Sequence, residues 1–194
     1  MEDPARRYVS RAALKLVYGL DVFGLDPREA RALDIGASTG GFTQVLLERG
    51  AAHVVAIDVG AGQMDARLRE DARVTCLEGV NARYLTLNEI DRRRPDFLVC
   101  DVSFISLKLA LPPALAMAES GAHGLFLVKP QFEAGREAIG KGGLLRDPER
   151  AEEIARELAS WLETNDGWRV LGLAPSPIEG GDGNREFLLA GRKQ

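Results

Sequence analysis

The chain has 194 residues, 45% of them hydrophobic, which suits one domain with a substantial core. Its 25 Lys and Arg residues against 29 Asp and Glu residues give a net charge of −4, which argues against a uniformly basic nucleic-acid binder but allows local basic patches. We find no signal peptide, no lipidation motif and no run of about 18 apolar residues, so we expect a cytoplasmic protein outside the membrane.

The N-terminal segment is basic and leads into the first predicted helix. Residues 1–9 are polar, and Ser10 is placed to cap a helix over residues 11–20 that carries one apolar face. No acid stands between Arg6 and Leu20. The cations of this stretch are Arg6, Arg7, Arg11 and Lys15. They are either a solvated helix face or contacts to the phosphates of a nucleic acid.

The most informative stretch covers residues 31–43, where an apolar run meets a glycine turn and a helix. The apolar run, interrupted by Asp34, predicts a buried parallel strand that ends at Gly36. Gly40 and Gly41 then open a helix. Glycines let backbone N–H groups approach a ligand, and a helix N-terminus attracts negative charge. This order predicts the nucleotide-binding end of an α/β fold.

Three ligands use a turn of this kind. A phosphate-cradling P-loop needs a lysine where Phe42 stands, which excludes it. A dinucleotide fingerprint needs a glycine where Ser38 stands, so that match is poor. The third ligand, S-adenosylmethionine, has no phosphate, a carboxylate suited to a helix N-terminus, and two cationic centres. An ordinary glycine turn in an α/β core remains the alternative.

Three acids at predicted strand ends favour the cationic ligand. Asp34, and Asp101 at the end of a later strand, suit cations and would repel a pyrophosphate. Asp58 ends the strand predicted at residues 54–58 and lies 22 residues past Gly36, near the ~20 expected of an acid that holds ribose hydroxyls. Together with the glycine turn, these acids predict an S-adenosylmethionine site.

Strands and helices alternate along the rest of the chain. Helices are predicted at residues 65–69, at residues 103–117 with a kink at Pro112, and from Asp147 onward. Further strands are predicted at residues 73–77, 95–101, 124–129, 168–173 and 186–190. The alternation predicts a mostly parallel, doubly wound α/β sheet flanked by helices, with no repeat or linker dividing the chain.

Polar or glycine positions fall at five predicted carboxyl strand ends, which is where ligands bind in such sheets. They are Gly36, Asp58, Asn81, Asp101 and Lys129. Lys129 directly follows the apolar run 125–128. It is either a lysine that reaches out to solvent or an amine that acts as a base, oriented by Asp101.

Two further observations concern a loop and the possible metal ligands. Residues 131–147 form a long predicted loop rich in glycines and cations, and we expect a mobile lid over residues 135–146. Cysteines and histidines give no sign of a metal site, because the former fall inside buried strands and the latter stand alone at strand starts. They are Cys76, Cys100, His53 and His123.

Five motifs resemble, in the same order, those of the FtsJ-type ribosomal-RNA ribose methyltransferases, and most closely the TlyA branch, which is often labelled hemolysin-like. They are Tyr8–Leu16, Leu33–Phe42, Cys100–Ser106, Val128–Glu133 and Gly183–Phe187. The Lys129–Glu133 motif together with Gly140–Gly143 is specific to that branch. The resemblance covers nearly the whole chain.

The resemblance implies a Rossmann-like S-adenosylmethionine-dependent methyltransferase fold, a seven-stranded sheet whose last strand is antiparallel. A single domain would cover residues 1–194, with an N-terminal basic segment and helix at residues 1–25 and the core at residues 26–194. The resemblance also implies S-adenosylmethionine as cofactor and methyl transfer to a ribose 2′-hydroxyl of ribosomal RNA. The partners would be ribosomal RNA or ribosomal subunits.

The family's functional residues can be carried over motif by motif. Its catalytic set falls on Lys15, Asp101, Lys129 and Glu186. Lys129 would deprotonate the hydroxyl, with Asp101 and Lys15 positioning it and Glu186 bonded within the same cluster. The residues expected at the cofactor are Asp34, Gly36, Ser38, Thr39, Gly40, Gly41, Phe42, Asp58, Asn81 and Asp101. Separately from the resemblance, the positive charge of the N-terminal segment and of the glycine-rich loop leads us to expect RNA contacts at Arg6, Arg7, Arg11, Arg136 and Lys141.

One departure from the TlyA branch bears on substrate binding. Its members usually carry a small N-terminal RNA-binding module ahead of the Ser-Arg motif, whereas Met1 stands just upstream of that motif here. We expect this chain to lack the module. Two other functions stay open, a hemolysin-like membrane-active protein and a non-catalytic module that binds RNA or cofactor. We expect no metal, and a monomer, although the sequence leaves the oligomeric state open.

Overall fold

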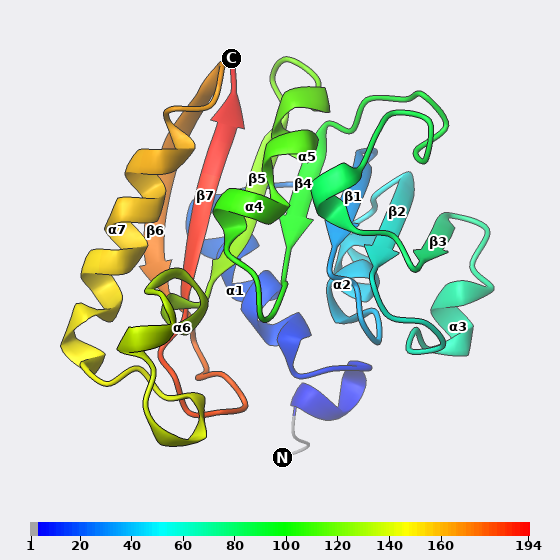
Figure 1. Ribbon diagram of the computed structural model, residues 1–194. Helices are drawn as coiled ribbons and strands as arrows, with labels where there is room; N and C mark the ends of the chain where they lie inside the picture. Colours follow the sequence, from blue (N-terminus) through cyan, green and yellow to red (C-terminus); the bar gives the residue numbers. More distant parts are fainter. Residues whose placement is uncertain (1–3) are drawn as a thin grey trace.

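Seven strands form one mixed sheet at the centre of the structure, a computed structural model that describes residues 4–194 (Figure 1). Strands β1 to β5 run parallel, and β7 pairs antiparallel with both β5 and β6. The order across the sheet is β3-β2-β1-β4-β5-β7-β6. The bounds are β1 Arg31–Ile35, β2 His53–Asp58, β3 Val74–Glu78, β4 Phe97–Cys100, β5 His123–Val128, β6 Trp168–Pro175 and β7 Phe187–Lys193. The order reverses between β1 and β4, which opens a crevice at their carboxyl ends.

Helices cover both faces of the sheet because the parallel strands are apolar on both faces (Figure 1). One buried cluster joins α1 and α2 to the sheet through residues such as Leu16 and Leu46. The other joins α4, α5 and α7 through residues such as Leu111 and Leu158. The α-helices are α1 Ala12–Phe23, α2 Gly41–Glu48, α3 Ala66–Arg69, α4 Leu107–Ala110, α5 Pro112–Met117, α6 Pro130–Glu133 and α7 Ala151–Leu162. The 3-10 turns are η1 Pro4–Arg7, η2 Ala82–Tyr84, η3 Arg136–Ala138, η4 Lys141–Gly143 and η5 Pro148–Arg150.

The predicted α/β fold is confirmed, including the seven strands and the antiparallel last strand. The N-terminal helix runs further than predicted, to Phe23, where Gly24 ends it in a left-handed conformation with φ of 63°. The first three residues of the predicted basic segment, Met1 among them, lie outside the described residues.

The helix predicted over residues 103–117 is too long. Residues 103–105 form a bend, and Phe104 has φ of +64°, a left-handed conformation incompatible with a helix interior. α4 begins only at Leu107, and Ser106 Oγ accepts a hydrogen bond from Lys108 N at 3.1 Å as its N-cap. Pro112 starts α5 rather than kinking a continuous helix, in line with the preference of proline for the first turn.

The loop predicted over residues 131–147 contains regular turns. α6 occupies its start, and η3 and η4 follow. Ile139 and Leu145 form an isolated antiparallel bridge, and Leu145 N donates to Asn184 Oδ1 at 3.0 Å. The segment is therefore joined both to itself and to the loop between β6 and β7. The helix predicted from Asp147 begins as the turn η5, and α7 follows from Ala151.

Candidate active site

A sharp glycine turn links β1 to α2. Gly36 has φ of +80°, and a Cβ there would lie 2.4 Å from the carbonyl oxygen of Asp101, so only glycine fits. The amides of Gly36 and Ala37 donate to Ile57 O at 2.9 and 3.1 Å. Gly40, with φ of +100°, is the N-cap of α2. The turn is therefore fixed against the carboxyl ends of β2 and β4.

Asp58, the last residue of β2, holds the loops on either side of it. Its Oδ2 accepts from Ser38 N at 2.8 Å and its Oδ1 from Gly60 N at 2.7 Å. A carboxylate has about four lone-pair sites, so both oxygens can still accept from a ligand. Asp58 lines a cavity of about 390 Å³, here termed the inner cavity. Its polar wall also includes Gly36, Ser38, Asn81 and Asp101, and its apolar wall includes Ile35, Ile57, Val80, Val102, Phe104 and Ile105.

Asp34 is enclosed by protein close to these strand ends. It is fully buried, and its Oδ2 accepts a hydrogen bond from Thr43 Oγ1 at 2.7 Å. Burial raises the pKa of Asp34 to about 7; the bond from Thr43 opposes this shift and the Asp101 carboxylate adds to it. Across residues 4–194, Asp34 Oδ1 finds no hydrogen-bond partner. A buried acceptor without a donor is costly, so a cationic group at these strand ends would relieve it.

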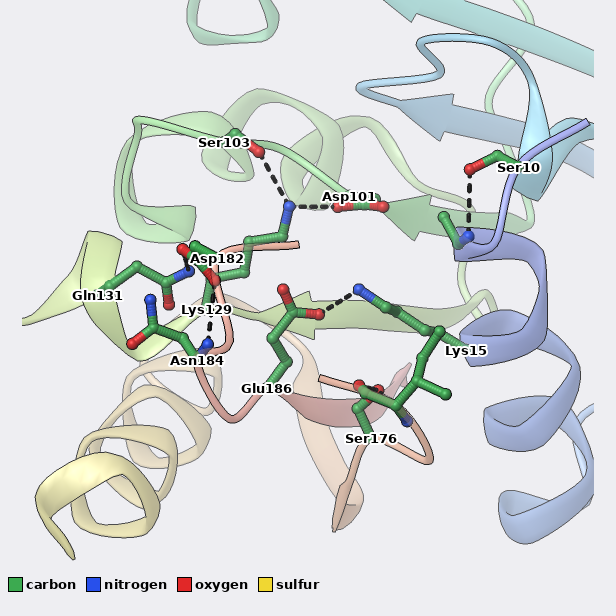
Figure 2. Close-up of polar contacts among 12 residues, drawn as sticks. Ser10, Lys15, Asp101, Ser103, Lys129, Gln131, Ser176, Asp182, Asn184 and Glu186 are labelled. Atoms are coloured by element: carbon green, nitrogen blue, oxygen red, sulfur yellow. Dashed lines mark hydrogen bonds and ion pairs between the residues drawn. The ribbon is translucent and has the colours of Figure 1, made fainter. Parts of the chain in front are cut away.

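Two ion pairs bring the four predicted catalytic residues together (Figure 2). Lys129 Nζ lies 2.7 Å from Asp101 Oδ1 and donates to Ser103 Oγ at 2.9 Å. Lys15 Nζ pairs with Glu186 Oε2. Apart from the ion pair, Asp101 Oδ1 is buried without a hydrogen-bond partner in the described part of the chain. Burial raises the pKa of Glu186, while the bond from Lys15 opposes that shift.

The four side chains come from distant parts of the sequence. Lys15 lies in the first turn of α1, Asp101 directly follows β4, and Lys129 directly follows β5. Glu186 directly precedes β7. Because β7 runs antiparallel to β5, its start lies at the carboxyl end of the parallel strands. The antiparallel strand is therefore what brings Glu186 to the same edge as Asp101 and Lys129.

Two further cavities open beside Lys129. A central cavity of about 150 Å³ is lined by Ser10, Thr39, Gly41, Phe42, Asp101, Ser103 and Lys129, among others. An outer cavity of about 330 Å³ is lined by Ser103, Phe104, Lys129, Gln131, Phe132, Gly142, Gly143, Gly181, Asp182 and Glu186. Ser103 lines all three cavities, and Lys129 lines the central and the outer one. Lys129 and its partners therefore lie between the central cavity beside the glycine turn and the outer cavity beside α6.

Sequence reasoning missed Ser103, Phe104 and Asp182 at this site. The Phe104 side chain is 91% exposed, lines both the inner and the outer cavity, and has its ring centroid 5.1 Å from that of Phe132. A bulky residue with positive φ is rare and costs of order 1–3 kcal/mol, so this one is a candidate for function. The available signal was an aromatic residue shortly after the strand-end acid Asp101, which helical patterning obscured.

The predicted cofactor residues fall into two groups. Gly36, Ser38, Thr39, Gly41, Phe42, Asp58, Asn81 and Asp101 line the inner or the central cavity. Asp34 and Gly40 are buried beside them. Asn81 also caps η2, where its side chain accepts from Arg83 N.

The predicted RNA-contacting cations lie on two separate segments rather than at the cluster. Arg6, Arg7 and Arg11 are exposed near the N-terminus, and Arg7 pairs with Glu48 at 2.6 Å. Arg136 and Lys141 are exposed on η3 and η4.

Neither a metal centre nor a membrane span emerges from residues 4–194. No group of three or more His, Cys, Asp or Glu residues among them is arranged to hold a metal ion. None of the helices in that range combines the length and apolar character that crossing a membrane requires.

Comparisons with known proteins agree with this geometry. The 16S/23S rRNA (cytidine-2′-O)-methyltransferase TlyA of Mycobacterium tuberculosis is 48% identical over 99% of this chain, and the alignment covers 71% of its own length. A Bacillus subtilis relative named as an rRNA methyltransferase, YqxC, is 45% identical over 94% of this chain and 65% of its own. The chain thus spans about two thirds of these curated relatives. A crystal structure from Lactococcus lactis, described as that of a hemolysin, superposes with a TM-score of 0.92 at 45% identity, covering 97% of this chain and 89% of that one. Residues 8–193 match the FtsJ-like methyltransferase family, and the chain belongs to that family.

Proposed function

We propose that this chain is an S-adenosylmethionine-dependent 2′-O-methyltransferase that acts on a ribose of ribosomal RNA. The observation that carries the proposal is the cluster of Lys129, Asp101 and Ser103 beside the Lys15–Glu186 pair, at the junction of the inner, central and outer cavities. A pure binding module has no need of two lysines and two acids gathered at one point. The relative from M. tuberculosis carries a name with this activity.

The inner and central cavities suit the cofactor. Gly36 and Ser38 line the inner cavity, and Asp58 keeps lone pairs for ribose hydroxyls. Asp34 Oδ1, which has no partner within residues 4–194, lies at the strand ends where positive charge would be stabilised. S-Adenosylmethionine would supply an electrophilic methyl group there.

The outer cavity suits the nucleotide that accepts the methyl group. Lys129 lines this cavity and the central one. As a neutral amine, after giving up the proton that it shares with Asp101, its Nζ would accept the proton of a ribose 2′-hydroxyl. Asp101 and Ser103 contact Nζ, and Glu186, paired with Lys15, lines the outer cavity beside it. Orientation of this kind is what an in-line displacement requires.

Phe104 provides an aromatic surface at the entrance. Its exposed ring stands between the inner and outer cavities, and exposed aromatic rings bind unstacked bases at about 1–3 kcal/mol per base. Phe132 supports the ring from α6. The backbone strain at Phe104 is the kind retained where it places a functional group.

Docking of ribosomal RNA or of a ribosomal subunit would use the exposed cations outside the cluster. Arg6, Arg7 and Arg11 lie near the N-terminus, and Arg136 and Lys141 lie on η3 and η4. Contacts of this class are salt-dependent and independent of sequence. The protein would act in the cytoplasm, where ribosomal subunits are.

The test is transfer of a labelled methyl group to purified ribosomal subunits, followed by mapping of the modified ribose. Lys129→Met should abolish transfer while S-adenosylhomocysteine affinity stays within about threefold. Lys108→Met, at an exposed lysine on α4, is the matched control and should keep wild-type transfer. Dye release from liposomes, insensitive to Lys129→Met, would instead favour the membrane-active alternative.

A further inference from the structure

The wall of the outer cavity is assembled by α6. Gln131 Nε2 donates to Asp182 Oδ2 at 3.0 Å in the loop between β6 and β7. Phe132 packs against Phe104 in the loop after β4. Glu133 Oε1 accepts from Leu107 N at 2.8 Å, where that same loop ends. Three successive residues after Lys129-Pro130 thus hold both loops that face the cavity.

Asp182 is fixed in orientation by two donors (Figure 2). Asn184 N donates to Oδ1 and Gln131 Nε2 to Oδ2, each at 3.0 Å. Burial would raise the pKa of Asp182, but the hydrogen bonds from Asn184 and Gln131 outweigh it and lower that pKa below its ordinary value. The Asp182 side chain is therefore an ionised carboxylate of fixed orientation at neutral pH.

The atoms of this wall that can still form hydrogen bonds are acceptors. A carboxylate has about four lone-pair sites, and the protein uses two of those on Asp182. Gln131, 5% exposed and also in the wall, has an Oε1 with no hydrogen-bond partner among the residues the structure describes. Glu186, paired with Lys15, adds a second carboxylate, and Lys129 lines the same cavity. The free acceptors on Asp182 and Gln131 favour a ligand that donates hydrogen bonds at this wall.

The outer cavity is also lined by aromatic side chains. Phe104 and Phe132 line the same cavity, whose volume of about 330 Å³ accommodates a planar ring. A ring held against an aromatic face, with an acceptor at its edge, is recognised by the donors on that edge. At the corresponding ring position, cytosine and adenine carry an exocyclic amino group, whereas uracil and guanine carry a carbonyl oxygen.

We propose that Asp182, held by Gln131, is a specificity-determining residue that accepts a hydrogen bond from the exocyclic amino group of the target base. This inference rests on the proposed function, because it assigns the base whose ribose is methylated. It excludes uridine, since a carbonyl oxygen facing the carboxylate leaves both acceptors unpaired.

The experiment compares two RNAs that differ only in the base at the mapped target. One carries the base with the amino group and the other carries its carbonyl analogue. The analogue is uridine if the target is cytidine and inosine if the target is adenosine. Single-turnover methylation by the wild-type chain should favour the amino-bearing RNA by about 10-fold to 100-fold. Asp182→Asn keeps the shape and adds an N–H donor, so it should reduce that ratio to within about threefold of one. Glu179→Gln, at an exposed acid in the same loop, is the control and should keep the wild-type ratio.

Several outcomes overturn the inference. The inference is wrong if Asp182→Asn keeps the wild-type ratio of rates on the two RNAs while its S-adenosylhomocysteine affinity is normal. It is also wrong if Asp182→Asn loses the same factor in rate on both RNAs. If Asp182→Asn does not fold, the wild-type chain is tested alone. Its methylation rate is compared on RNA with and without two methyl groups on the amino nitrogen of the target base. Equal rates refute recognition of that amino group. A mapped target that is uridine also refutes it. Absence of methyl transfer to any ribosomal RNA is a different result, because it refutes the proposed function itself.

Discussion

Replacing Lys15 and Glu186 singly and together should separate the stability of the fold from its chemistry. The two side chains form an ion pair and are only 7% and 4% exposed as residues. Lys15→Met alone leaves a buried carboxylate without its cation, and Glu186→Leu alone leaves a buried ammonium. Each should lower the free energy of unfolding by about 3–5 kcal/mol. The double variant removes both charges and fills the space with apolar groups, so its stability should return to within about 1–2 kcal/mol of wild type.

Methyl transfer should not return with stability. If the pair positions Lys129 and the ribose, the double variant stays slower than wild type by roughly 10²-fold or more in single-turnover methylation of bound RNA. Urea unfolding gives the stability and quenched single-turnover reactions give the rate. Additive losses of stability in the double variant would refute the electrostatic coupling. A wild-type rate in the double variant would refute any part of the pair in the reaction.

Four further predictions address other parts of the molecule. Asp58→Ala removes an acceptor for the cofactor ribose, so calorimetry with S-adenosylhomocysteine should show binding weaker by roughly 1.5–3 kcal/mol, and unchanged affinity in a folded variant would place the adenosine elsewhere. Neutralising Arg6 and Arg7 should reduce the slope of log affinity for RNA against log salt by about 1 to 2 units, and an unaltered slope would remove them from the interface. Because the pKa of Asp34 is raised from 3.8 to about 7, the folded state keeps the proton of this carboxyl to a higher pH than the unfolded state does. The free energy of unfolding should therefore fall as the pH rises from about 4 to about 7. Asp34→Asn should remove that part of the pH dependence, as measured by urea unfolding at each pH. Amides of residues 135–146 should exchange with solvent rapidly in the free protein and slowly with RNA bound, whereas strong protection without RNA would contradict a mobile lid.

The sheet could be predicted from the sequence because its information is local. Apolar runs bounded by glycine or acid marked each strand, and polar residues directly after those runs marked the ligand-binding edge. Asp101 and Lys129 are examples: their positions follow from strand ends alone, and their ion pair follows from the parallel pairing of β4 with β5. Asp58 is another, at the end of β2.

The rest of the site depends on contacts that no local pattern contains. Lys15 and Glu186 pair across 171 positions of sequence, so only a family resemblance could join them before the fold was known. The left-handed backbone at Phe104 is a property of one residue, and the surrounding Ser, Ile and Leu residues fit a helix equally well. The proposed role of Asp182 depends on Gln131, which reaches it from α6.

The distribution of charge explains how an acidic chain can serve an RNA substrate. Asp58 and Asp101 face the side where a sulfonium and an ammonium would lie, Lys129 stands at the centre, and Asp182 and Glu186 face the outer cavity. The outer cavity holds the Asp182 and Glu186 carboxylates beside the Lys129 amine, and under the proposed function the base and ribose of the RNA would enter it while the phosphates stay outside. Under the proposed function the exposed cations on the N-terminal segment and on η3 and η4 would contact that backbone. Because the two sets of charges are separate, salt should weaken docking of the RNA without changing the proposed proton transfer to Lys129.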